Sequence, residues 1–150
     1  MIKIICVGKI KEKFFKESIS EYQKRLTKYS KVEILELPDF SLAPDQNKEK
    51  EGELILKNIK TKDYVITLEI EGKQLNSIEI SNLLDKVQME NSNIVFVIGG
   101  SNGLSDGVKN RSNYALSFSK LTFPHQLFRI ILLEQIYRSF KIINNESYHK

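Results

Sequence analysis

Three short segments of the chain place glycines or polar residues directly after a run of strand-forming residues. They are Leu68–Lys73, Gly99–Leu104 and Phe118–Pro124. Ligands of open parallel sheets bind at the carboxyl ends of the strands, where such segments meet. Gly99, Gly100 and Gly103 would let the backbone approach a ligand closely or adopt a positive φ. The three segments therefore predict a small-molecule site, with a plain tight turn as the alternative for the glycines.

The glycine segment can be compared with three known motifs. It lacks the Gly-Lys-Ser/Thr ending of a P-loop and the G-x-G-x-x-G spacing of dinucleotide-binding loops. It does match G-x-S-x-G, in which Ser101 would be a nucleophile and Glu134 and His149 would complete a hydrolase triad. Against this alternative, 102–107 separates Ser101 from the next helix, whereas a nucleophilic serine leads directly into a long one.

The third segment combines polar and apolar side chains. Lys120 and Thr122 offer polar contacts. Leu121 and Phe123 could wall an apolar or aromatic ligand such as a purine. The segment therefore suits a ligand that has both a polar and an aromatic part.

The end of the chain offers charged and aromatic residues for polar chemistry. Glu134 and Arg138 form an i, i+4 pair on an otherwise apolar helix, which favours a partly buried site over surface decoration. Tyr148 can stack on a base, and His149 can titrate near neutral pH. The alternative for both is a frayed terminus. Arg129, earlier on the helix, could join a cationic surface.

The elements that must position these residues follow from the apolar pattern, which alternates five strands with five helices. Strands are predicted at 2–7, 32–37, 64–70, 94–98 and 115–119. Helices are predicted at 14–29, from within 39–47 to about 59, from an N-cap at Ser77 to about 87, near 105–110, and after Pro124. The order predicts an α/β fold, a single domain over residues 1–150, with a mostly parallel sheet and helices on both faces.

The last helix is apolar around more of its circumference than one side of a sheet can bury. Its apolar residues between Leu127 and Ile143 leave only a narrow polar strip. Such a helix is buried on two sides, either by a second copy of the chain in a two-fold dimer or by the core of a monomer. The pattern alone leaves both alternatives open.

Composition limits the remaining classes of protein. The 150 residues suit one domain, and one cysteine with two histidines gives neither a disulfide framework nor a zinc site. No apolar stretch approaches the length of a membrane span, so we expect a cytoplasmic protein. The net charge of +4, with basic ends and an acidic middle, hints at a polyanionic partner, against the alternative of a solvated lysine-rich surface.

Six blocks of residues, in this order, closely resemble the RlmH family over essentially the whole chain. They are Val7-Gly8-Lys9, Thr67-Leu68-Glu69 with Gly72-Lys73, Phe96 to Gly103, Leu116 to His125, Glu134 to Arg138, and Tyr148-His149-Lys150. Members of that family are SPOUT methyltransferases that methylate N3 of a pseudouridine in bacterial large-subunit ribosomal RNA. The resemblance thus implies an enzyme, whereas a non-enzymatic RNA-binding module would need the basic ends but no cofactor.

The resemblance also implies a C-terminal trefoil knot, a homodimer and S-adenosylmethionine bound by the three segments. The cofactor contacts it implies are Leu68, Gly99, Phe118, Ser119, Lys120, Leu121, Thr122 and Phe123, with Gly100 and Gly103 in the same loop as Gly99. It further implies that the tail of one protomer completes the site of its partner. The substrate is expected to be ribosomal RNA within the assembled ribosome, because a net charge of +4 gives little affinity for naked RNA.

The expected catalytic residues are Glu134, Arg138, Tyr148 and His149. N3 of a uracil ring is a poor nucleophile until its proton leaves, so the protein must align and deprotonate it. His149 is the candidate base, with solvent as the alternative. Arg138 would favour the uracil anion, and Glu134 would orient Arg138. No metal is required.

Overall fold

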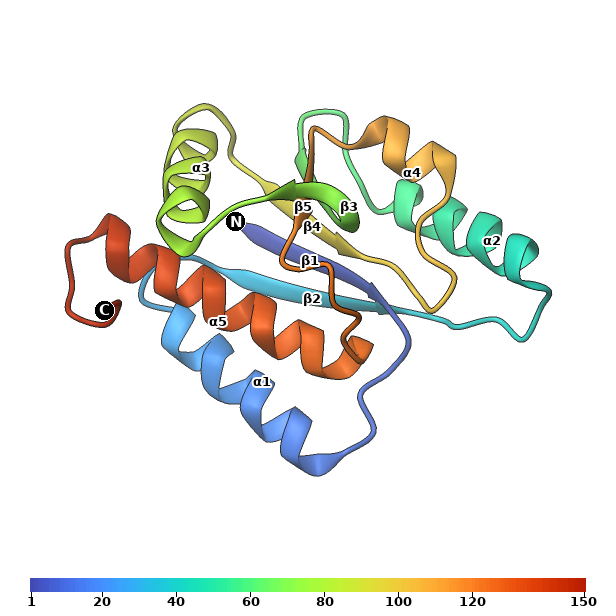
Figure 1. Ribbon diagram of the computed structural model, residues 1–150, viewed down its shortest axis with the longest axis horizontal. Helices are drawn as coiled ribbons and strands as arrows, with labels where there is room; N and C mark the ends of the chain where they lie inside the picture. Colours follow the sequence, from blue (N-terminus) through green and yellow to red (C-terminus); the bar gives the residue numbers. More distant parts are fainter.

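The computed structural model describes residues 1–150 and contains a single five-stranded sheet (Figure 1). The strands are β1 (Ile2–Val7), β2 (Val32–Leu37), β3 (Tyr64–Gln74), β4 (Ile94–Ile98) and β5 (Tyr114–Ser117). Their order across the sheet is β2-β1-β4-β3-β5, and every neighbouring pair is parallel. The predicted α/β fold with a parallel sheet is therefore confirmed.

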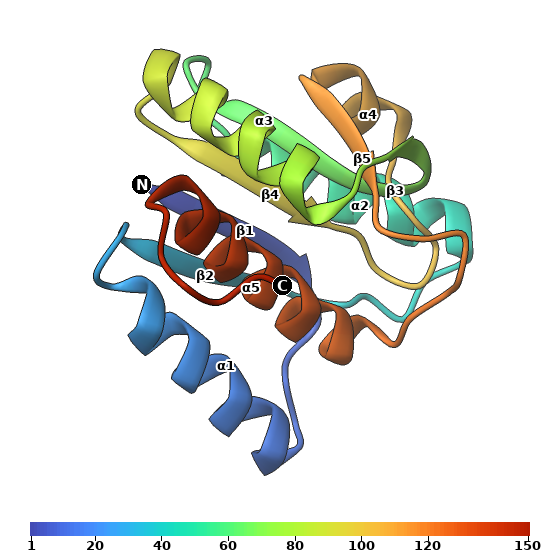
Figure 2. The ribbon, with the colours of Figure 1, turned by 60° about the vertical axis from the view of Figure 1, so that its left-hand side comes forward.

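Five helices cover the two faces of this sheet (Figures 1 and 2). They are α1 (Lys13–Leu26), α2 (Pro44–Lys57), α3 (Ser77–Glu90), α4 (Asp106–Arg111) and α5 (His125–Ile143). On one face α5 lies between α1 and α3, as Figure 2 shows, and on the other α2 packs beside α4. None of the helices is long and apolar enough to cross a membrane.

The central strand β4 divides the core into two apolar clusters. All five of its residues are buried, as its uniformly apolar sequence predicts. Ile94, Phe96 and Ile98 face the cluster under α1, α3 and α5. Val95 and Val97 face the cluster under α2 and α4. This alternation is that of a strand covered on both faces, and it leaves the carboxyl edge of the sheet to the loops.

Several predicted boundaries differ from the structure: the helix predicted at 14–29 is Lys13–Leu26, and the strand predicted at 115–119 is Tyr114–Ser117. Two further differences have a clear physical cause. The N-cap of α3 is Asn76, one residue before the predicted Ser77, because Asn76 and Glu79 form a reciprocal capping box. The strand predicted at 64–70 continues to Gln74, so the expected turn near Gly72 is instead an irregularity inside β3.

This irregularity lies in the part of β3 that pairs with β5. Leu68 and Lys73 both pair with Leu116, so the residues between them bulge out of the ladder. A methyl group on Gly72 would lie 2.8 Å from the backbone carbonyl of Ala115. This close approach of the β3 and β5 backbones is consistent with the C-terminal trefoil knot that the resemblance implies.

We expect Gly72→Ala to destabilise the protein by about 1–3 kcal/mol, because the added methyl group must push two backbones apart. The midpoint of urea unfolding should fall accordingly. Gly107→Ala is the matched control, since a methyl group there would meet nothing closer than 3.5 Å and alanine favours helix α4. Equal midpoints for the two variants would show that β3 and β5 are not tightly packed at this point.

Candidate active site

The first loop of the candidate site is fixed by a buried threonine at the end of the regular part of β3. The hydroxyl of Thr67 donates a hydrogen bond of 2.6 Å to the carboxylate of Glu69 and contacts the hydroxyl of Ser112 at 2.7 Å. Leu68, between them, is half-buried. These contacts hold the Leu68 backbone at the carboxyl edge of the sheet.

The glycine loop after β4 closes on itself. The amide of Gly103 donates to the carbonyl of Gly100 at 3.1 Å, and Gly103 has a φ of +80°. A methyl group on Gly99 would lie 2.9 Å from Leu104 Cδ2 and 3.0 Å from the Gly103 carbonyl oxygen. The amides of Ser101 and Asn102 donate to no acceptor in the chain. The loop is thus a glycine cradle with free backbone donors.

The third loop is folded by its own serines and by the start of α5. Ser117 donates to the carbonyl of Ser119, and the Ser119 hydroxyl accepts from the amide of Leu121 at 3.0 Å. The rings of Phe118 and Phe123 both pack on Phe128, with centroids 5.1 Å and 5.9 Å from it. Four residues of this loop are exposed: Lys120, Leu121, Thr122 and Pro124.

The three loops converge because β4, β3 and β5 are adjacent and parallel. The ten residues predicted to contact the cofactor lie in or just after these three strands, at the same edge of the sheet. Among the exposed large apolar side chains are Leu121, 68% exposed, and Ile70 beside the first loop, 51% exposed. Free amides beside exposed apolar groups suit a ligand that is partly polar and partly aromatic.

A second cluster unites the four predicted catalytic residues on α5 and the tail. Arg138 donates to Glu134 Oε1 through Nε at 3.0 Å and Nη2 at 2.5 Å, and the Tyr148 hydroxyl donates to the same oxygen at 3.1 Å. The Arg138 guanidinium lies over the Tyr148 ring, 4.7 Å from its centroid. Arg138 Nη1 is 3.0 Å from His149 Nδ1. We call these four residues the tail cluster.

The hydrogen bonds of the tail cluster fix its protonation states. The bond to Glu134 raises the pKa of Arg138, which therefore remains a cation. Burial, and then the bond to Glu134, raise the pKa of Tyr148, so its hydroxyl remains a donor. Because Arg138 can only donate, His149 Nδ1 accepts, and the ring proton is on Nε2. Nδ1 is then the only ring nitrogen that can accept a proton, and it does so only after His149 turns away from Arg138.

The tail is held by Glu146, a residue that sequence analysis did not single out. Its carboxylate accepts from Lys28, in the turn after α1, at 3.1 Å, from Lys141 of α5 at 2.9 Å and from the Tyr29 hydroxyl at 3.0 Å. These contacts turn the chain back along α5 (Figure 2). The expectation of a frayed end is therefore wrong for residues up to His149. Partners more than 100 residues away in sequence left no local signal.

We expect Glu146→Gln to free residues 147–150, because the amide cannot hold two ammonium groups. Hydrogen bonds from Lys141 and then Lys28 lower the pKa of Glu146 to about 2. The contribution of this carboxylate is therefore complete above its ordinary pKa of about 4.3 and is lost as the pH falls towards 2. Backbone 15N relaxation at pH 7 should show new fast motion in the tail.

Glu33→Gln is the control for this prediction, since it removes an exposed ion pair with Lys31 that lies outside the tail. Its tail should relax like that of the unchanged protein. An ordered tail in Glu146→Gln would contradict the anchoring role of Glu146.

The tail cluster is distant from the third loop of its own chain, measured along α5. Helix α5 begins at His125, directly after the third loop, and Arg138 lies thirteen residues further on. At 1.5 Å per residue this separation is about 20 Å along the helix axis. Within one chain, the third loop and the tail cluster are therefore separated by most of the length of α5.

Two interpretations from the sequence are wrong. The hydrolase triad is absent, because Glu134 and His149 bond to Arg138 and not to Ser101, and the six-residue helix α4 starts only at Asp106. Arg129 does not join a cationic surface. It is 1% exposed and donates to the carbonyls of Val7 and Gly8 and to Glu36.

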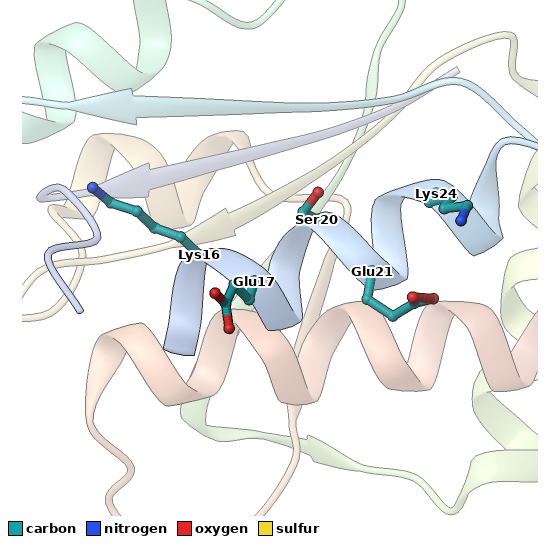
Figure 3. Close-up of a pocket in the computed structure, with 5 residues that line it drawn as sticks. All are labelled: Lys16, Glu17, Ser20, Glu21 and Lys24. Carbon is teal, nitrogen blue, oxygen red and sulfur yellow. The ribbon is translucent and has the colours of Figure 1, made fainter. Parts of the chain in front are cut away.

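Other features of the surface do not compete with this site. Figure 3 shows a depression on α1 lined by Lys16, Glu17, Ser20, Glu21 and Lys24. All five belong to the helix itself, and none belongs to a loop of the site or to the tail cluster.

The chain offers neither a reactive thiol nor a metal site. Burial raises the pKa of the Cys6 thiol to about 11, so Cys6 is not a nucleophile. The structure contains no group of three or more His, Cys, Asp or Glu side chains that could hold a metal ion.

Comparison with known proteins identifies the class defined by this fold and site. The family described as "Predicted SPOUT methyltransferase" matches residues 1–149. The crystal structure of a tRNA (m1G37) methyltransferase from Aquifex aeolicus superimposes with a TM-score of 0.53, covering 91% of this chain and 69% of that one at 17% identity. That likeness supports the fold. The chain belongs to the SPOUT methyltransferases, as the resemblance implies.

Curated relatives narrow this class. A protein of Clostridium botulinum (strain Kyoto / Type A2) is 55% identical over 99% of both chains, and one of Clostridium tetani is 54% identical over 99% of both. A relative from Caldicellulosiruptor saccharolyticus is 52% identical over the full length of both. All three are named ribosomal RNA large subunit methyltransferase H, so within the SPOUT class the chain belongs to the RlmH family.

Proposed function

We propose that this protein transfers a methyl group from S-adenosylmethionine to N3 of a pseudouridine in large-subunit ribosomal RNA. The proposed substrate is the assembled ribosome, the whole chain acts as one domain, and it works in the cytoplasm. The observation that carries the proposal is the convergence of three loops around a glycine cradle at the carboxyl edge of the sheet. A non-enzymatic RNA-binding module would not need this cradle.

The residues of the three loops fit the proposed methyl donor. Free amides of the glycine loop suit the ribose hydroxyls and the carboxylate of S-adenosylmethionine, and Leu121 and Phe123 suit its adenine ring. Gly99 and Gly100 leave the space that a side chain would fill. When bound, this donor supplies a methyl group already activated on a sulfonium.

A homodimer is proposed because α5 keeps one face uncovered. Leu127 is 37% exposed, and Ile131, Glu134 and Arg138 on the same face are half-buried. Pro124 and Arg138 both lie seven residues from Ile131. An antiparallel copy of α5, related by a two-fold axis near Ile131, would therefore bring the partner's Arg138 to the third loop. Each site would then combine the loops of one protomer with the tail cluster of the other.

The tail cluster supplies the groups that activate the uracil ring for methyl transfer. As the N3–H bond breaks, its electron pair forms the new bond to the methyl carbon, and the bond from carbon to sulfur breaks to leave a neutral thioether. Arg138, held by Glu134, stabilises the negative charge that develops on the ring. Tyr148 offers a flat surface against which the ring can pack. His149 takes the proton at Nδ1 after turning away from Arg138.

We expect His149→Ala to lower the rate of methyl transfer by about 10²-fold, the range of a lost general base. The rate of the unchanged protein should depend on pH, and the variant should lose the part of this dependence that a general base contributes. Single-turnover rates from pH 6 to pH 9 test both points. Equal rates across this range would assign the proton to solvent instead.

The function itself is tested with S-adenosylmethionine carrying a tritiated methyl group. Three substrates are compared: joined ribosomes lacking the modification, free large subunits, and protein-free ribosomal RNA. Label on joined ribosomes alone would support both the reaction and the need for an assembled surface. Label on naked RNA would show that the protein reads RNA structure by itself. No label on any substrate, despite measured binding of the donor, would refute the proposed substrate.

A further inference from the structure

A carboxylate is buried directly against the glycine loop. Glu51 of α2 is only 2% exposed, and its Oε1 has no hydrogen-bond partner. A methyl group on Gly100 would lie 3.0 Å from Oε1 and 3.2 Å from Oε2 of this side chain. The carboxylate of Glu51 therefore lies against the backbone of the glycine loop.

Helix α2 holds this carboxylate against the loop without freedom to withdraw. Gly52, the next residue, lies so close to Ser105 that a methyl group on it would clash with the Ser105 hydroxyl. Ser105 is buried and caps α4, which follows the glycine loop. The position of Glu51 relative to Gly100 is thus set by packing on both sides.

No cation of the chain neutralises Glu51. Its carboxylate takes part in no ion pair, and the neighbouring acidic residue, Asp39, opposes its ionisation further. The buried guanidinium of Arg129 is engaged by Glu36 and two carbonyls. Burial raises the pKa of Glu51, so the carboxyl keeps its proton more readily than usual, and a cation bound in the glycine loop would favour the ionised form.

We propose that Glu51 makes the site prefer the cationic methyl donor S-adenosylmethionine to its neutral product, S-adenosylhomocysteine. This inference rests on the proposed function, because it needs that donor in the glycine cradle. The sulfonium carries the only charge that the reaction removes, so the attraction of Glu51 ends when the methyl group leaves. The residue would thereby favour binding of the donor and release of the product.

The size of the effect follows from the separation of the charges. Two opposite unit charges about 8 to 12 Å apart, at an effective dielectric constant of about 20, change affinity on the order of ten- to thirtyfold. Glu51→Gln keeps the shape of the side chain and removes only its charge.

The test is calorimetric binding of three ligands to the full-length protein and to two variants. The ligands are S-adenosylmethionine, S-adenosylhomocysteine, and sinefungin, an analogue with an amine where the donor carries its methyl sulfonium. The variants are Glu51→Gln and the control Glu53→Gln, which removes an exposed charge from the same helix. Thermal unfolding of each variant shows whether its fold is retained.

For Glu51→Gln we expect affinity for the two cationic ligands to fall by about tenfold, with affinity for the neutral product unchanged within about twofold. Glu53→Gln should bind all three like the unchanged protein. A Glu51→Gln variant that loses the same factor for all three ligands, or that loses nothing, would overturn the inference. Failure of the unchanged protein to bind S-adenosylmethionine would instead refute the proposed cofactor.

Discussion

Arg138→Ala should lower methyl transfer to ribosomes by about 10²–10³-fold while leaving the affinity for S-adenosylmethionine unchanged, because Arg138 belongs to the tail cluster and not to the loops. The loss reflects the charge that develops on the uracil ring after N3 gives up its proton. Glu134 holds the guanidinium through two hydrogen bonds, so its direction is fixed before substrate arrives. Single-turnover transfer and calorimetric binding measure the two effects separately.

Arg138→Lys separates charge from geometry. A lysine keeps the positive charge but cannot make the paired contact with Glu134, and we expect it to recover only part of the activity. Full recovery by lysine would show that charge alone is needed at this position.

A mixture of two inactive variants tests whether the site is shared between protomers. Arg138→Ala keeps intact loops and Gly99→Ala keeps an intact tail cluster, so a mixed dimer would contain one complete site. With random pairing, half of the dimers are mixed and one of their two sites works, which gives about a quarter of the original activity. No recovery in coexpressed protein would place both parts of the site in one chain.

Local sequence patterns were sufficient where an element depends on its own residues. Strands β1, β2 and β4 begin and end at the predicted residues, because each is an apolar run closed by glycine, proline or a polar residue. Strand β3 was predicted too short, since its last residues are extended only because they pair with β5, more than 40 residues further on. Pairing between distant segments leaves no periodic signal in either one.

The charged residues of the site show the same limit. Glu134 and Arg138 could be paired from their spacing alone, because helical neighbours are fixed by geometry. Glu146 and Arg129 could not, because their partners lie on other elements. Nothing in the sequence around Arg129 indicates that it is buried. In the structure it reaches from α5 to the end of β1, where it donates to the carbonyls of Val7 and Gly8. Glu51 resembles the other acids of a charged helix until the fold places it against the glycine loop.

The second large effect is expected for Gly99→Ala, which should weaken binding of S-adenosylmethionine by about 10²-fold or more. The added methyl group would lie 3.0 Å from the Gly103 carbonyl oxygen and 2.9 Å from Leu104 Cδ2. Both contacts are shorter than packed groups allow, and the first involves backbone, so the loop itself must move. The amides of Ser101 and Asn102 would then no longer converge on one ligand. Calorimetric titration measures the loss.

Gly103→Asn complements this variant. It tests the effect of the backbone conformation, whereas Gly99→Ala tests the effect of steric crowding. Gly103 has a φ of +80° and no atom within 4 Å of an added Cβ. Asparagine tolerates positive φ better than other residues with a side chain, so we expect binding to weaken by less than about tenfold. Gly103→Val, which resists that conformation, should bind far more weakly than Gly103→Asn. If both Gly103 variants bound as weakly as Gly99→Ala, any side chain would disable the loop, and the close approach at Gly99 would not explain the site.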